Sequence, residues 1–190
     1  MSLSSRKISL LVLAANAVFF GTAPTMAQSK VSTYSAQVIV QNAFTITETT
    51  PLNLGTIAAV SSNTAGTQAA ISLNPGTGAT TTAQGAGGSS ARILAVAPPT
   101  RGMIAVTHAP PSTVLTVSNP GSSYDLTNAA EPGTPPLVFT PAYAAVGFNY
   151  VTSPTGTLNI NIGGTLTTTQ SPTAYADGVY MGSYQLQITY

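Results

Sequence analysis

The sequence has no cysteine and no tryptophan, and only 5% of its 190 residues carry a charge. Without cysteine there is no disulfide framework, no thiolate metal site and no lipid attachment of the bacterial lipoprotein kind. Five Lys and Arg residues against four Asp and Glu leave no cationic cluster for binding nucleic acid. No repeat of fixed period is visible, which excludes a solenoid or a propeller.

Few residues are of the types that carry catalysis. The one histidine, His108, lies beside no nucleophile motif and is interpreted as an exposed turn residue. Asp125 and Glu131 share a loop, and with Asn128 they make only a sparse calcium candidate. The glycine-rich stretch 85–88 lacks the lysine of a phosphate loop. The sequence predicts no catalytic residue, no cofactor and no metal, and so a protein that is not an enzyme.

The first 27 residues are typical of a secretory signal peptide. Arg6 and Lys7 precede an apolar run, Ile8–Phe20, and the small residues before Gln28 offer a cleavage site. The run is too short to serve comfortably as a membrane anchor, which needs roughly 20 apolar residues. We therefore expect export to the periplasm, the cell surface or the medium, with no transmembrane segment after cleavage.

Residues 28–190 are expected to form one domain with a sizeable core. Its composition, rich in Thr, Ser, Gly, Ala, Val and Pro, favours strands punctuated by turns. The formal net charge of this part is −1, from three cations and four acids: Lys30, Arg92, Arg101, Glu48, Asp125, Glu131 and Asp177. A surface so poor in charge opposes neither association nor packing into a polymer.

Alternation of apolar and polar residues is clearest near the two ends of this domain. At its beginning, the apolar positions share one parity: Tyr34, Ala36, Val38, Val40, Phe44 and Ile46. At its end, the segment Gly178–Tyr190 alternates again and is predicted to be one strand that runs to the last residue. Its predicted core face consists of Tyr180, Tyr184, Leu186, Ile188 and Tyr190, with Gly182 in the same row.

Between these ends the pattern predicts short strands separated by Asn-Pro-Gly and Pro-Pro turns. Thr77–Ser90 is predicted to be a mobile loop, and Tyr124–Pro136 to be irregular. Gly163-Gly164 is expected to form a tight hairpin turn or a bulge, and Tyr143–Val146 could form one helical turn. The prediction is an all-β, antiparallel sandwich of about nine short strands.

Eight tyrosines are many for a chain without tryptophan. Those at alternating strand positions are expected in the core. Tyr124 and Tyr175 fall in predicted loops and could stack on a sugar ring or a partner protein. They are the basis of an alternative function, a cell-surface recognition module that binds glycan or another protein.

The end blocks also resemble a known family. Leu158-x-Ile160-x-Ile162-Gly163-Gly164, followed by Gly178-x-Tyr180-x-Gly182-x-Tyr184-x-Leu186-x-Ile188-x-Tyr190, is similar to the C-terminal signature of the exported bacterial domain-of-unknown-function family 4402. Ala43–Thr47 and Pro51–Ile57 resemble its opening block. More distantly, the same blocks resemble spore coat protein U domains and chaperone–usher pilins. This chain departs from those relatives in having no cysteine.

The resemblance implies an immunoglobulin-like, pilin-like sandwich that a strand from a chaperone, usher or neighbouring subunit completes. Lys30–Val40 would be the strand donated; it could equally be an ordinary first strand of a complete sandwich. The leading hypothesis is a secreted structural subunit of a surface fibre, pilus or coat. The predicted assembly strands carry Tyr34, Ala36, Val38, Val40, Tyr180, Gly182, Tyr184, Leu186, Ile188 and Tyr190.

Overall fold

The computed structural model describes residue 37 and residues 44–144 and 149–190. The chain divides into two units, Met1–Ile39 and Val40–Tyr190, and only Gln37 of the first unit is described. The predicted signal peptide therefore lies outside the described residues. So do two of the four residues of the turn predicted at Tyr143–Val146, and four of the predicted assembly positions, Tyr34, Ala36, Val38 and Val40.

The second unit is all-β, and its described residues contain thirteen strands and no helix. The strands are β1 (Thr45–Thr50), β2 (Thr56–Val60), β3 (Ala70–Leu73), β4 (Thr80–Ala83), β5 (Arg92–Ala97), β6 (Gly102–Thr107), β7 (Val114–Ser118), β8 (Tyr124–Asn128), β9 (Leu137–Tyr143), β10 (Asn149–Val151), β11 (Leu158–Thr167), β12 (Tyr180–Met181) and β13 (Gln187–Thr189). The all-β prediction is confirmed, but nine strands were too few. β4 lies in the predicted mobile loop and β8 in the predicted irregular segment.

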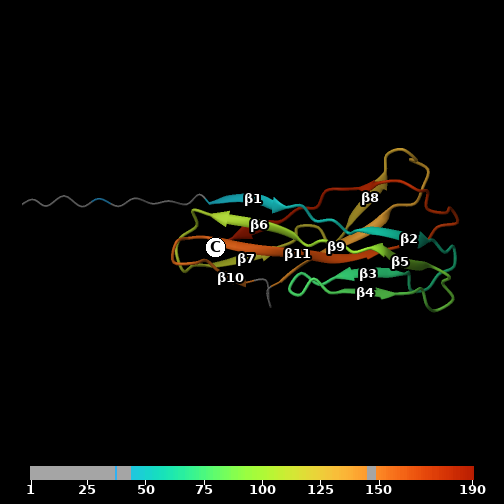
Figure 1. The fold of residues 1–190 in the computed structure, drawn as a ribbon, viewed down its shortest axis with the longest axis horizontal. Coiled ribbons are helices and arrows are strands. Elements are labelled where there is room, and N and C mark those ends of the chain that lie inside the picture. Colours follow the sequence, from blue (N-terminus) through green and yellow to red (C-terminus); the bar gives the residue numbers. More distant parts are fainter. Residues whose placement is uncertain (1–36, 38–43, 145–148) are drawn as a thin grey trace, which may run out of the picture. The chain divides into compact units, whose positions relative to one another are not determined.

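One long strand, β11, organises the largest sheet (Figure 1). The sheet runs β1-β6-β11-β9-β8-β12, and β3, flanked by β4, also pairs with β11. The first half of β11 pairs with β6 and the second half with β3, while β9 occupies its other edge from Ile162 to Thr167. All these pairings are antiparallel, and β6 and β3 lie end to end along one edge of β11.

A glycine pair marks the point where β11 changes partner. The prediction of a hairpin turn or bulge at Gly163-Gly164 is wrong, because the strand continues through both residues and its register with β9 has no shift there. A Cβ on Gly163 would lie 2.2 Å from the Leu73 carbonyl oxygen at the end of β3. Gly164 has a φ of +152°, and a Cβ there would lie 2.5 Å from the Phe139 ring. Only glycine permits this close approach.

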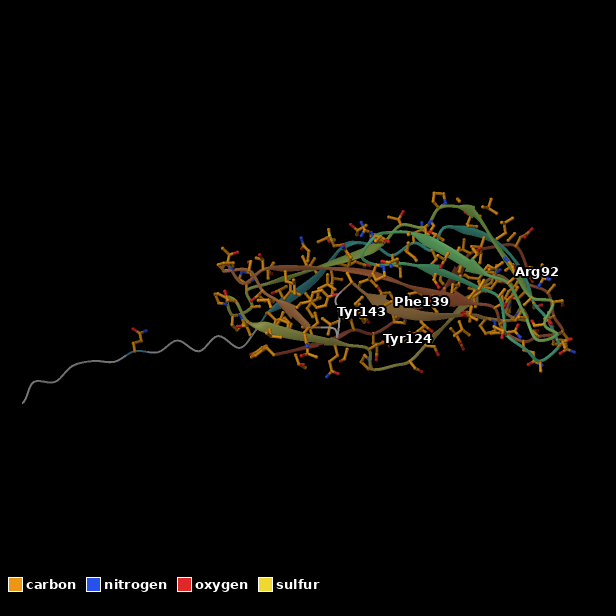
Figure 2. The ribbon with its side chains drawn as sticks, turned by 90° about the horizontal axis from the view of Figure 1, so that it is seen from below. Arg92, Tyr124, Phe139 and Tyr143 are labelled. Carbon is orange, nitrogen blue, oxygen red and sulfur yellow. The ribbon has the colours of Figure 1, made fainter. Side chains whose placement is uncertain are left out.

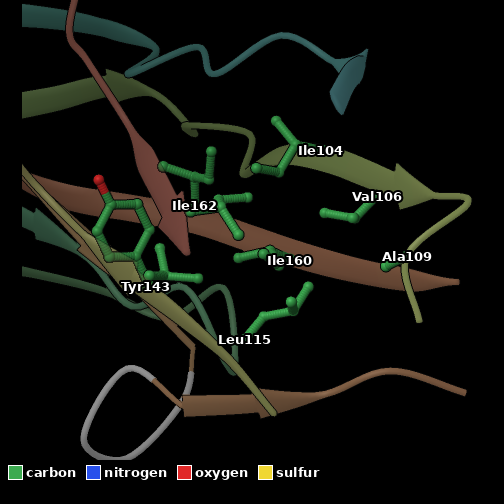
Figure 3. Close-up of a cluster of buried hydrophobic side chains, with 9 residues drawn as sticks. Ile104, Val106, Ala109, Leu115, Tyr143, Ile160 and Ile162 are labelled. Carbon is green, nitrogen blue, oxygen red and sulfur yellow. The ribbon is translucent and has the colours of Figure 1, made fainter. Parts of the chain in front are cut away.

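Two smaller sheets form the second layer of the sandwich. One has the order β10-β7-β13 and the other is the pair β2-β5. Leu115, Val117 and Ile188 of the first pack on Ile160 and Ile162 of β11, in the cluster we call core 1 (Figure 3). The sheet β2-β5 covers core 2, the buried cluster of Ala69, Ile71, Ala91, Ile93, Leu137, Phe139 and Leu166.

Gln84 closes one edge of β5 with its side chain. Its amide nitrogen donates to the Ile93 carbonyl at 2.8 Å, and its amide oxygen accepts from the Ile93 N–H at 3.0 Å. The side chain thereby replaces a pairing strand, so that no further strand can add at this point of β5.

We expect Gly164→Ala to destabilise the domain strongly, by roughly 2–5 kcal/mol. The positive φ and the overlap with the Phe139 ring each cost about 1–3 kcal/mol. Urea unfolding measures the difference, with Gly133→Ala as the control because no atom lies within 4 Å of a Cβ placed there. Equal stabilities of the two variants would contradict the role assigned to the glycine pair.

Candidate functional site

Two edge strands meet beside the beginning and the end of the second unit. Among the described residues, β1 pairs only with β6, and β13 pairs only with β7. The Phe44 ring, just before β1, contacts the Tyr190 ring, just after β13, edge-on with centroids 5.9 Å apart. The open edges of the two layers therefore lie next to each other, and we call β1 and β13 together the terminal edge.

An apolar side chain of β1 faces the interior but is left uncovered. Ile46 lies opposite Val106 in the β1–β6 register, so both side chains are on the core face of the sheet. Val106 is completely buried, whereas Ile46 is 45% exposed. The layer that should cover Ile46 ends at β13. One more strand beyond β13 would occupy the space over Ile46.

Glu48 occupies the same core-facing row of β1, opposite Ile104. Sequence reasoning placed no functional residue there, although an acid at the parity of Phe44 and Ile46 breaks an otherwise apolar row. Its charge contributes to the raised pKa of the Tyr184 hydroxyl, after the larger effect of burial. The terminal edge thus combines an uncovered isoleucine with one carboxylate.

The C-terminal segment is not the single strand that its alternation predicts. β12 pairs with β8 in the large sheet, whereas β13 pairs with β7 in the opposite layer. The residues between them cross from one layer to the other. Gly182 begins this crossing, where a Cβ would lie 2.4 Å from the Asp125 carbonyl oxygen. Strand alternation alone does not show such a change of sheet, because both halves keep the same inward parity.

The predicted core face of this segment is correct in its middle but not at its last residue. Ile188 is buried, and Tyr184 and Leu186 are half-buried against core 1. The Tyr184 ring also packs edge-on against Phe139, with centroids 5.6 Å apart. Tyr190 is 55% exposed and belongs to the terminal edge.

The two tyrosines predicted in loops have structural partners. Tyr124 begins β8, and its hydroxyl donates to Asn119 Oδ1 at 2.7 Å while its ring contacts Tyr184. The Tyr175 hydroxyl accepts from the Thr169 N–H at 2.8 Å, and its ring contacts Tyr180. The loop assignment of Tyr124 is therefore wrong, and both tyrosines are half-buried against another tyrosine of the domain.

The remaining candidates for chemistry are dispersed. His108 follows β6 and is exposed, as expected, with a φ of 63°. Across the described ranges, no three His, Asp or Glu side chains form a group that could hold a metal ion. In the same ranges, no helix has the length and apolar character needed to cross a membrane.

Burial raises the pKa of a second tyrosine beside the site, Tyr143. Tyr143 lies at the side of core 1 (Figure 3) and is only 7% exposed. Loss of hydration, followed by repulsion from Tyr184, Tyr124 and Tyr150, raises the pKa of its hydroxyl to about 12. The folded state therefore holds this proton at pH values where the unfolded chain, with a pKa near 10, has released it.

We expect the free energy of unfolding to fall between pH 10 and pH 12, and Tyr143→Phe to remove part of this fall. The contribution of one such group is on the order of 2 kcal/mol, fully present below pH 10 and lost by pH 12. Urea unfolding of both proteins from pH 8 to pH 12 tests this. If the free energies of unfolding of the two proteins change in parallel from pH 8 to pH 12, Tyr143 does not titrate as described.

The chain matches no protein-family model, no curated protein and no solved structure. The resemblance of its end blocks to family 4402 stays a prediction.

Proposed function

We propose that this protein is a secreted, non-enzymatic structural subunit of a surface fibre, pilus or coat, which assembles when a strand from another molecule adds to the terminal edge. The exposure of Ile46 is the observation that most supports this proposal. This side chain faces the core but lies beyond the reach of the layer that ends at β13. A sandwich with this gap resembles the incomplete, immunoglobulin-like domain of pilin-like subunits.

The free edge of β13 offers the backbone groups that an added strand needs. Its three residues, Gln187, Ile188 and Thr189, include no proline and no charge, and only β7 pairs with them. Added strands gain affinity from backbone hydrogen bonds and register from alternate side chains. One side of the new strand would face core 1 beside Ile46 and Leu186.

Lys30–Val40 has the pattern that this edge requires. Tyr34, Ala36, Val38 and Val40 would present one apolar face to core 1. Of the residues between them, Ser35 and Gln37 are polar and Ile39 is apolar. We propose that a neighbouring copy supplies this segment, with a periplasmic chaperone or usher as the partner before assembly.

The donated strand is tested by the double substitution Val38→Asp and Val40→Asp. Two carboxylates on the face that enters core 1 should abolish assembly, since a buried unpaired charge is strongly unfavourable. Deleting residues 28–37 should have the same effect, and both variants should still fold. Size-exclusion chromatography with chemical crosslinking gives the readout. A wild-type protein that stays monomeric at all concentrations would overturn the proposal, as would a double variant that assembles normally.

The accepting edge is tested separately by Ile46→Ser. Because Ile46 is already 45% exposed, the folded monomer should lose little stability, about 1 kcal/mol or less. Binding of a synthetic peptide spanning residues 30–42 to the chain that lacks residues 28–37 should weaken by about tenfold or more. Val114→Ser on β7 is the matched control, with 52% exposure. If both substitutions weaken peptide binding equally, Ile46 is not part of the binding site.

A further inference from the structure

The outer side of the sheet β2-β5 carries an exposed apolar surface with one cation. Ile93 and Ala95 of β5 face core 2, so their neighbours on the strand point outward. Leu94 and Val96 are 64% and 65% exposed, and Val60 on β2 is 56% exposed. Arg92 lies directly opposite Val60 in the register. We call this surface the arginine face; its members are Ala58, Val60, Arg92, Leu94 and Val96.

A second apolar surface, with the opposite charge, lies where β8 pairs with β12. Leu126 faces core 2, so Asp125 and Thr127 point to the other side of the large sheet. Met181 lies opposite Thr127 and is 71% exposed, and Val179 just before β12 is 72% exposed. We call this surface the acidic face; its members are Asp125, Thr127, Val179 and Met181, with Asp177 and Glu131 beside them.

Buried Asn128 links the main chains of two acidic residues of this region. Its side-chain nitrogen donates to the Asp177 carbonyl oxygen at 3.3 Å, and its own carbonyl oxygen accepts from the Glu131 N–H at 3.2 Å. Asp125 lies on the same strand, β8. Three of the four acids in the described residues therefore belong to this one end of the sheet, the fourth being Glu48 on β1.

Of the two arginines in the described residues, Arg92 is the one that remains available for an ionic contact. Arg101 donates from Nη1 to the carbonyl oxygens of Pro75 and Gly76 at 3.0 and 2.7 Å. Arg92 uses one such bond, to the Ala91 carbonyl oxygen at 2.8 Å, and it is exposed. A guanidinium has five N–H donors, so most of those on Arg92 can still bind carboxylates.

The two faces lie on opposite sides of the sandwich. The arginine face is the outer side of the covering layer, and the acidic face is the outer side of the large sheet, with core 2 between them. Figure 2 shows Arg92 toward one end of the domain, with Phe139 of core 2 nearer its middle. The two surfaces therefore cannot meet within one molecule.

We propose that the arginine face of one copy docks on the acidic face of the next, so that copies of the chain stack through opposite sides of the sandwich. The apolar side chains supply the buried area. Attraction between Arg92 of one copy and Asp125, Asp177 and Glu131 of the next determines which surfaces pair and in which orientation. A contact between two different surfaces is heterologous and does not close on itself in a dimer, so each docked copy presents a free face for another. This contact is separate from strand addition at the terminal edge.

Engineered cysteines can detect this contact cleanly, because the chain has no cysteine of its own. We expect the variant carrying both Val96→Cys and Met181→Cys to form a ladder of disulfide-linked multimers under mild oxidation. A mixture of the two single variants should stop at mixed dimers, and neither alone should crosslink efficiently. Val151→Cys on β10 is the control, with 61% exposure. It should not crosslink to Met181→Cys.

Charge reversal tests the orientation. Arg92→Glu should lower the crosslinked fraction by about tenfold, and adding Asp125→Arg with Asp177→Arg should restore it. Salt at roughly 1 M should weaken the contact between the unmodified faces. Dimers formed by Val96→Cys alone, or a double-cysteine ladder no stronger than the Val151→Cys control, would overturn the proposal.

The experiment is repeated in the full chain carrying Val38→Asp and Val40→Asp, which removes strand donation. A ladder that persists in this background confirms a contact independent of the terminal edge. A ladder that disappears there overturns the face-to-face contact and leaves the proposed strand addition standing.

Discussion

The pairing of β11 along both of its edges is the constraint on which the rest of the sandwich depends. Its first half joins β6, its second half joins β3, and β9 occupies the opposite edge. A strand that serves two partners end to end must bring their ends close to its own backbone. Gly163 and Gly164 permit this, because any side chain there would strike Leu73 or Phe139. The same face of β11 then supplies Ile160 and Ile162 to core 1 and Leu166 to core 2.

The division into two cores explains why the terminal edge is open. The covering layer consists of two separate small sheets, β10-β7-β13 over core 1 and β2-β5 over core 2. Over core 1 that layer ends at β13, while the large sheet extends one strand further, to β1. Ile46 therefore faces an interior that the described part of the chain does not complete. An open edge of this kind comes from the sheet topology and would persist in any sequence that keeps this strand order.

The sequence predicted the inward parity of individual strands better than their partners. Alternation identified Ile160, Ile162 and Ile188 as core residues, because side-chain period depends only on local backbone geometry. It did not show that Gly178–Tyr190 crosses between layers, since β12 and β13 share one parity. Alternation also predicts a hairpin turn or a bulge at Gly163-Gly164, because the role of these glycines comes from Leu73 and Phe139, which are distant in sequence and approach them closely.

The edges of this protein differ in how much apolar surface an added strand would bury. Gln84 blocks β5 at Ile93 by binding both of its backbone groups. The edge strand β4 consists of threonine and alanine, so that an added strand would cover little apolar surface. Beside β13, an added strand would cover Ile46 and half-buried Leu186 as well as pair with the backbone. Because hydrogen bonds to water are nearly as favourable as those to a new strand, apolar burial decides where addition is stable. That criterion favours the terminal edge over the edges at β4 and β5.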